Sequence, residues 1–521
     1  MPSRSIGCGS PWRRKLACAA LGATLACALS FSLLPGTFPP AIVLLPMALA
    51  AVGASAPSLG AAWRWGLTVS LPGYSLALTW VMVPVQTEGG LPFFLAAPCP
   101  VLLGALLAAY AGLFSFAVFF LKDHAQSPWT PMTLGAVWAS LELGRGVLFT
   151  GFPWLVLAQA LVPWPWTLGL ARWIGAFGLS GMLAAAGSIL VLWTGRRRLW
   201  ALVPAGIMLL PLAFPLPEPL ATLTAALVQG NIDQGQKWDP TLQEAILDTY
   251  LGLSRQAAQN HPDLIIWPET ATPFHPQDPG PLVDRLHAEA ASWKTPLLFG
   301  APAYSLVETA PPTYVLHNRA YLLGRDGKQV AWYDKEHLVP FGEYVPWGNW
   351  LPFLSKLVPG DYEFAPSAAT APLPLSRDVR LGVLICYEAI FPELARDRIR
   401  DGASILVNIS NDAWFGDSAA PRQHLALTAL RAVESGRAIF RATNTGITAA
   451  IAPDGTILKT LPQFTPSVLV AELPVLTSTT VYHQHFWRIH GAFMLIAVGG
   501  LLVRFLRPQL LKRKHHHAAI S

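Results

Sequence analysis

The sequence predicts an integral membrane protein in which a helical membrane domain carries an α/β layered domain, and three observations support this. Of the 521 residues, 53% are hydrophobic and only 13% are charged, whereas about 25% of a soluble domain is charged. Apolar runs long enough to cross a bilayer recur through the first 216 residues. After Pro215 the chain becomes rich in Asp, Glu and Asn, and strand-length apolar runs alternate with helical patterns.

The membrane part is predicted from apolar runs of about 20 residues, the length that crosses a hydrocarbon core of about 30 Å. The fourth run is long, so that it is either tilted or broken near Pro98 and Pro100. The fifth run contains Glu142 and Arg145, which we expect to pair with each other or to face the protein interior. The eight predicted spans are 16–34, 41–58, 64–85, 93–121, 132–149, 168–193, 199–216 and 487–506.

The orientation is predicted from the cations beside these runs. Short clusters such as Arg13-Arg14-Lys15 and Arg196-Arg197-Arg198 alternate with loops that lack cations, which is the positive-inside pattern. With both termini in the cytoplasm and an uncleaved first helix, the chain divides into a membrane domain (1–217), an extracytoplasmic domain (218–486) and a last span with a cytoplasmic tail (487–521). The net charge of +6 then reflects topology, and no basic face interleaved with aromatics predicts nucleic-acid binding.

The polar domain is predicted to be layered α/β. The turns Asp326-Gly327 and Asp454-Gly455 indicate two hairpins. Helical spacing covers about 423–442 and 389–400. Buried strands are expected at 225–232, 263–268, 296–301, 380–387 and 404–410.

Cys386 is the one cysteine of this polar domain, since Cys8, Cys18, Cys27 and Cys99 lie in or beside N-terminal apolar segments. It therefore has no disulfide partner in its domain, and no two cysteines have metal-ligand spacing. Judged on the cysteine count alone, a buried and inert core thiol is the better interpretation.

Three strand ends carry reactive residue types. Glu269 directly follows an apolar strand, a position at the rim of a sheet where α/β sites form. Lys335 follows a hairpin strand and leads into a Pro/Gly-rich turn that holds Glu343. Read singly, each is more simply a surface residue. Cys386 ends a third strand and a helical pattern follows, so that a strand-to-helix elbow would expose its sulfur. A thiol at a helix N-terminus beside a cation is expected to have a lowered pKa.

These residues resemble the Glu-Lys-Cys triad of the nitrilase superfamily, and the short sequence motifs around them resemble those of the bacterial apolipoprotein N-acyltransferases. The resemblance covers essentially the whole chain and implies an α-β-β-α sandwich inserted before the last of about eight membrane helices. These motifs are Gln229-Gly230-Asn231, Trp267-Pro268-Glu269-Thr270, Pro340-Phe341-Gly342-Glu343-Tyr344-Val345-Pro346, Cys386-Tyr387-Glu388 and Asn411-Asp412-Ala413-Trp414-Phe415-Gly416.

The resemblance implies that the enzyme takes an acyl chain from a phospholipid, preferably phosphatidylethanolamine, through a thioester on Cys386. The acceptor is the α-amine of a diacylglyceryl-cysteine at a lipoprotein N-terminus. Glu269 is implied as the base and Lys335, with the Tyr387 backbone N–H, as the oxyanion stabiliser. The resemblance implies no metal and no organic cofactor, and we expect a monomer in the bacterial inner membrane. Supporting or substrate-binding roles are implied for Glu343, Trp238, Tyr387, Glu388, Asn318 and Trp414.

Two other readings stay open at this stage. A membrane-anchored amidase or nitrilase would use the same triad with water as the acceptor, and a transport or scaffolding protein would need no triad at all. The membrane frame favours lipid substrates, and so does an aromatic stretch at 345–358, which we interpret as a flap for lipid entry or as a marker of the headgroup level. The tail His515-His516-His517 is interpreted as a solvated end.

Overall fold

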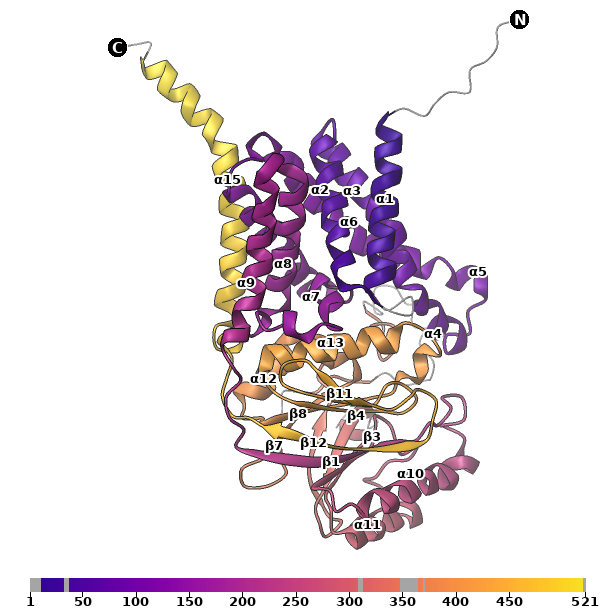
Figure 1. Cartoon of the computed structure of the whole chain (residues 1–521). Coiled ribbons are helices and arrows are strands. Elements are labelled where there is room, and N and C mark those ends of the chain that lie inside the picture. The colour runs from indigo at the N-terminus through magenta and orange to yellow at the C-terminus, as the bar shows by residue number, and fades with distance from the viewer. Residues whose placement is uncertain (1–10, 32–36, 308–312, 347–363, 369–370, 519–521) are drawn as a thin grey trace, which may run out of the picture. The chain divides into compact units, whose positions relative to one another are not determined.

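The computed structural model describes the chain except for residues 1–10, 32–36, 308–312, 347–363, 369–370 and 519–521 (Figure 1). The side chains of 507–518 also lie outside the description. The chain forms two compact units, one of residues 1–82, 97–213 and 485–521 and the other of residues 83–96 and 214–484. The aromatic stretch after Val345 and the histidine tail therefore fall largely outside the described residues and side chains.

The first unit is helical, as predicted (Figure 1). Three described helical stretches, which lie wholly or mostly in this unit, are long and apolar enough to cross a membrane: Phe93–His124, Ala171–Leu192 and Phe486–Leu506. A fourth qualifies if two helices that bend by 54°, Leu59–Ala77 and Thr79–Thr87, form one span. The total of eight spans stays a prediction. The main helices are α1 (Pro11–Ser30), α2 (Leu44–Ser55), α3 (Leu59–Ala77), α6 (Cys99–Leu121), α7 (Trp129–Val147), α8 (Ala171–Leu192), α9 (Leu202–Leu209) and α15 (Phe486–Ala518).

Helices α7 and α8 pack closely because each has a glycine at the contact. A Cβ on Gly135 would lie 2.7 Å from the Gly181 carbonyl oxygen, and one on Gly181 would lie 2.6 Å from the Gly135 carbonyl oxygen. Small residues let helix backbones approach in this way where lipid removes the hydrophobic drive between helices. The predicted fourth span is interrupted at 97–98, between α5 (Phe93–Ala96) and α6.

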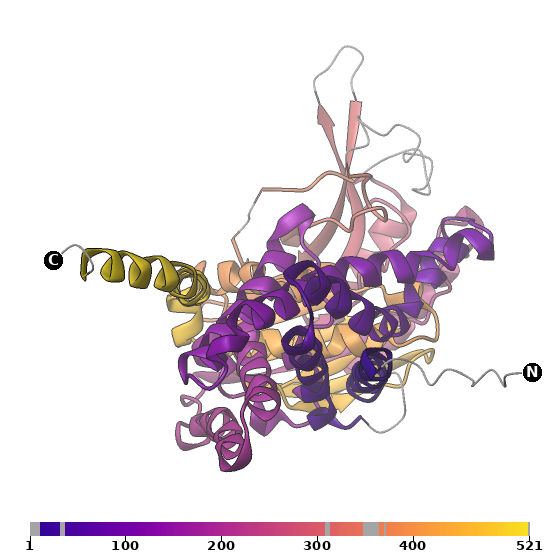
Figure 2. The same cartoon turned by 90° about the horizontal axis from the view of Figure 1, so that it is seen from above.

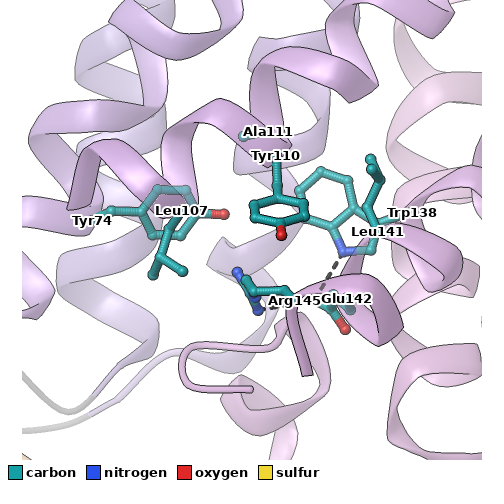
Figure 3. A pocket seen from close by; sticks show the side chains of 8 residues that line it. All are labelled: Tyr74, Leu107, Tyr110, Ala111, Trp138, Leu141, Glu142 and Arg145. Atoms are coloured by element: carbon teal, nitrogen blue, oxygen red, sulfur yellow. Dashed lines mark hydrogen bonds and ion pairs between the residues drawn. The ribbon is translucent and has the colours of Figure 1, made fainter. Parts of the chain in front are cut away.

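Glu142 and Arg145 of α7 are both buried and lie 4.0 Å apart, as the i,i+3 spacing predicted. The Glu142 carboxylate accepts hydrogen bonds from Trp138 Nε1 (2.9 Å) and from the Leu157 backbone N–H (3.0 Å), so it fastens the segment after α7 to that helix. Figure 3 shows these side chains around a pocket that Tyr74 and Tyr110 also line.

The second unit is a sandwich of two six-stranded sheets. The first sheet has the order β12-β1-β2-β3-β4-β5 and the second β11-β10-β9-β8-β7-β6. Strands β1, β2 and β3 are parallel neighbours, as are β7, β8 and β9. The first sheet contains β1 (Ala221–Gln229), β2 (Leu264–Ile266), β3 (Leu297–Val307), β4 (Thr313–Leu323), β5 (Gln329–Asp334) and β12 (Ser467–Val475). The second contains β6 (Leu373–Pro374), β7 (Arg380–Ile385), β8 (Ile405–Ser410), β9 (Ile439–Thr443), β10 (Ala449–Ile451) and β11 (Ile457–Thr460).

Alternate residues of these strands build separate layers of core. Leu227 and Ile266 of the first sheet share a cluster with Val383 and Val407 of the second, so the two sheets bury these faces against each other. The opposite face of the first sheet packs on α10 (Gln243–Ala258) and α11 (Pro281–Trp293). Helices α12 (Pro392–Arg400) and α13 (Ala420–Ser435) cover the second sheet (Figure 1). The predicted α-β-β-α sandwich is thereby confirmed.

Most predicted elements of this unit are present, and both Asp-Gly turns join antiparallel strand pairs. The helix predicted over 423–442 is wrong at its end, because α13 stops at Ser435 and Ile439 begins β9. Gly436 adopts a left-handed conformation (φ 61°), which terminates the helix. The long β3–β4 pair, drawn in pink, projects from the rest of its unit in Figure 2.

Candidate active site

Glu269 lies just past the end of β2 and is 5% exposed. The backbone beside it approaches the neighbouring strand so closely that a Cβ on Gly300 would lie 2.6 Å from the Glu269 Cα. The Gly300 N–H donates to the Pro268 carbonyl (3.1 Å), and its own carbonyl accepts from the Ala271 N–H (2.7 Å). A side chain at position 300 would therefore push the Glu269 backbone out of place.

The Glu269 carboxylate accepts hydrogen bonds from three directions. Asn318 Nδ2 of β4 donates to one oxygen at 2.6 Å, and Lys335 Nζ lies 3.4 Å from the same oxygen. The Asn411 backbone N–H, at the end of β8, donates to the other oxygen at 2.8 Å. Residues from both sheets thus hold one carboxylate in a fixed orientation.

Lys335 follows β5 directly and is 1% exposed. Its Nζ lies 2.9 Å from Glu343 Oε1, and Glu343 is itself held by the Val339 N–H at 2.8 Å. Burial alone would lower the pKa of Lys335, but the charges of Glu343 and Glu269 outweigh it and raise that pKa. The lysine is therefore a permanent ammonium between two carboxylates, and Asn318 also donates to Glu343 at 3.1 Å.

Cys386 stands at the elbow where β7 ends. It has a left-handed backbone (φ 51°), which is costly for a non-glycine residue, and a short 3-10 turn (Cys386–Ile390) precedes α12. Burial and the charge of Glu269 raise the pKa of the Cys386 thiol, although the charge of Lys335 opposes them. The prediction of a lowered pKa was wrong, since the burial of the Cys386 thiol outweighs the nearby Lys335 cation. A neutral thiol needs a base, and Glu269 is the adjacent carboxylate.

Glu388 fixes the shape of the elbow. Its carboxylate oxygens are occupied by hydrogen bonds to neighbouring groups and are not directed at the triad. It is fully buried and accepts from the backbone N–H groups of Ile385 (2.7 Å) and Glu336 (2.7 Å). The Tyr333 hydroxyl donates to it at 2.7 Å. Tyr387 packs edge-on against Phe391 with ring centroids 5.1 Å apart.

A second buried network behind Cys386 was not predicted. His424 Nε2 lies 3.0 Å from the Cys386 carbonyl oxygen, and its Nδ1 lies 3.3 Å from Asp412. Arg441 Nη2 donates to Asp412 at 2.7 Å. Burial would raise the pKa of Asp412, but Arg441 outweighs it and lowers that pKa. Asp412 belongs to the motif that begins Asn411-Asp412 and directly follows a predicted strand. This motif was the one signal in the sequence that could have pointed to the network.

The structure brings five predicted residues together, namely the triad with Asn318 and Glu343. Trp238 lies in a turn and Trp414 in a short 3-10 helix (Asp412–Phe415), and the described interactions join neither of them to the triad. Trp238 is 51% exposed in a turn after β1.

Both parts of the chain are similar to known protein families. Residues 22–189 match the apolipoprotein N-acyltransferase N-terminal domain, and residues 224–481 match the carbon–nitrogen hydrolase family. The apolipoprotein N-acyltransferase of Geobacter metallireducens is 37% identical, with 87% of this chain and 88% of the relative covered. That of Azotobacter vinelandii is 35% identical with 92% of each covered. The carbon–nitrogen hydrolase structure from Helicobacter pylori G27 covers 51% of this chain and 94% of its own at 17% identity, with a TM-score of 0.37.

The relatives that match most of the chain are named apolipoprotein N-acyltransferases, and the helical part of the chain matches the N-terminal domain of that family. Acyl transfer to lipoproteins is therefore favoured over hydrolysis, and the chain is a bacterial membrane enzyme. It belongs to the apolipoprotein N-acyltransferase family.

Proposed function

We propose that Cys386, Glu269 and Lys335 are the catalytic residues of this lipoprotein N-acyltransferase. The proposal rests on one observation, the convergence of three strand ends. The strained Cys386 elbow lies close enough to the Glu269 carboxylate and the Lys335 ammonium for both charges to act on its thiol. Each of the three side chains is buried, which is where electrostatic stabilisation of a reacting group is strongest.

The first half-reaction forms a thioester. Glu269 takes the proton of the Cys386 thiol, and the thiolate attacks the ester carbonyl of the phospholipid. The carbonyl electron pair moves to the oxygen, which Lys335 and the Tyr387 backbone N–H stabilise. As the tetrahedral intermediate collapses, the C–O bond breaks and Glu269 returns the proton to the departing lysophospholipid. The acyl chain remains on the sulfur.

The second half-reaction forms the amide. The α-ammonium of the diacylglyceryl-cysteine loses a proton to Glu269, and the free amine attacks the thioester carbonyl. Glu269 releases this first proton to solvent. As the C–S bond breaks, the proton that the attacking nitrogen must still lose passes through Glu269 to the Cys386 sulfur. We propose phosphatidylethanolamine as the preferred donor and a monomer as the working form.

We also propose the topology predicted from the cations, with residues 218–486 on the periplasmic side of the inner membrane, 1–217 as the membrane domain and 487–521 as the last span and tail. A cysteine placed at the exposed Asp326 turn should react with a membrane-impermeant maleimide in spheroplasts, and one at the exposed Arg196 should not. Labelling with the opposite preference would reverse the proposed orientation.

The catalytic assignment is tested by intact-mass measurement of the purified full-length enzyme after incubation with phosphatidylethanolamine and no acceptor. The parent should gain one acyl chain that hydroxylamine removes, and Cys386→Ala should gain none. Cys18→Ala, which changes an exposed thiol, is the matched control and should load like the parent. Loading of Cys386→Ala at the parent level would refute the assignment.

A further inference from the structure

The loop after β1 (residues 230–239) is tied by hydrogen bonds to residues that lie beside Glu269. Asn444 fastens it by exchanging two hydrogen bonds with the backbone of Ile232, at 2.9 and 2.7 Å. Gln234 accepts from the Asn411 side chain at 2.7 Å, and the backbone N–H of the same Asn411 donates to Glu269. A single residue, Asn411, therefore links this loop to the Glu269 carboxylate through hydrogen bonds.

Lys237 is the anomaly of this loop. Its neighbours from 235 to 239 are exposed, yet Lys237 is 0% exposed. Among the described residues, its Nζ has no hydrogen-bond partner. A lysine is almost never fully buried unless it is paired, because an unpaired buried ammonium destabilises a fold. A purely structural role would not explain why this position holds a lysine.

The charges around Lys237 point to a catalytic purpose. Lys335 stands between the carboxylates of Glu269 and Glu343, so its positive charge is already matched and exceeded. The negative charge of Glu269 also attracts the ammonium of Lys237 and favours its charged form. With both carboxylates ionised, the pocket carries one net negative charge if Lys335 alone is counted, and Lys237 as an ammonium makes it neutral.

Other charged groups leave this balance unchanged. Asp412, whose charge reaches Cys386, is paired with Arg441. Asp233 and Asp239 are exposed to solvent, and Glu88 interacts with Asp233. Burial lowers the pKa of Lys237 to about 8 although the charge of Glu269 opposes it, so most molecules carry an ammonium there at neutral pH.

We propose that Lys237 is a positioning residue whose positive charge, as the counter-charge to the second carboxylate, holds Glu269 in place to take the proton of the Cys386 thiol. Lys237 acts through its field and keeps its own protons while the thiol proton passes to Glu269 and the C–S bond forms. This inference rests on the catalytic assignment of Cys386 and Glu269 proposed above.

The test compares Lys237→Met, which removes the charge at similar length, with Lys237→Arg, which keeps it. Lys328→Met, an exposed lysine of the same unit, is the control. For each full-length enzyme, the rate of Cys386 alkylation by iodoacetamide is followed against pH by mass spectrometry of the Cys386 peptide. Acyl loading from phosphatidylethanolamine and the midpoint of thermal unfolding are measured beside it.

Lys237→Met should need a higher pH for the same alkylation rate and should load at least about tenfold more slowly. Its unfolding midpoint should equal or exceed that of the parent, because a buried unpaired charge has been removed. Lys237→Arg should restore part of the pH profile, and Lys328→Met should match the parent.

A Lys237→Met profile that coincides with the parent would overturn the proposal. So would a lowered unfolding midpoint in Lys237→Met together with an equal loss in Lys237→Arg, since both would indicate a structural role. A parent enzyme that forms no acyl adduct would instead refute the catalytic assignment, so the two failures are distinguishable.

Discussion

At the scale of single residues, Asn318 is the group on which both site carboxylates converge. Its Nδ2 donates to Glu269 and to Glu343, and two carboxylates this close repel each other unless donors lie between them. The Asn318 side chain thus holds Glu269, the proposed base, and Glu343 at a fixed separation.

Asn318→Ala should slow acyl loading about 100-fold, the usual loss when one buried donor of an active site is removed. Asn318→Asp should lose more, because a third carboxylate would join the two already present. Loading is measured by intact mass over time. Asn260→Ala, at an exposed position, should load within about twofold of the parent, and an Asn318→Ala enzyme with parental rates would show that the amide is dispensable.

The sequence predicted the triad from three strand ends together with the family resemblance. Lys335 and Cys386 directly follow β5 and β7, and Glu269 lies three residues past β2. Lys237 was not predicted, since it stands among polar residues of a turn where no periodicity marks a buried position. The Asn411 donor is a backbone group, and its use depends on how two distant strands end together.

At the scale of elements, the contact between β3 and the end of β2 sets the place of Glu269. Gly300 is the residue on β3 that allows it, because any Cβ there meets the Glu269 backbone. Strand order could be read only coarsely from the sequence. The apolar runs predicted that strands exist, but their pairing into two sheets depends on contacts between distant residues.

Gly300→Ala should reduce acyl loading by at least about tenfold, since even a 1 Å displacement of a reacting group is costly. The control is Gly252→Ala in α10, where an added Cβ meets nothing within 4 Å. That change should leave loading intact and stabilise the helix by about 0.5–1 kcal/mol. Equal loading in both variants would contradict the role of the close contact.

At the scale of the whole molecule, the resistance to acid of the second unit (residues 83–96 and 214–484) depends on groups that folding buries. Burial, together with Arg431, Arg437 and Arg396, lowers the pKa of His483 to about 3. The unfolded chain protonates this histidine below about pH 6.5. Because the unfolded state then binds the extra proton, the stability that His483 contributes is present above pH 6.5 and is lost as the pH falls toward 3.

Between pH 6.5 and pH 5 this linkage amounts to about 2 kcal/mol. His483→Phe, which keeps a ring and removes the titration, should unfold with a smaller pH dependence over that interval. The measurement is the thermal unfolding midpoint of parent and variant at matched pH values. A gap between them that stays constant from pH 7 to pH 5 would show that His483 does not titrate on unfolding.

The second unit consists of two stretches of chain, 83–96 and 214–484. In the sequence, the shorter stretch falls between helices that belong to the first unit. The second unit is therefore not one contiguous segment of the chain. A fragment that begins after the last N-terminal helix would leave part of its own fold behind. A crystallisable, excised version of the domain would have to carry residues 83–96 back in, for example as a linked extension ahead of β1.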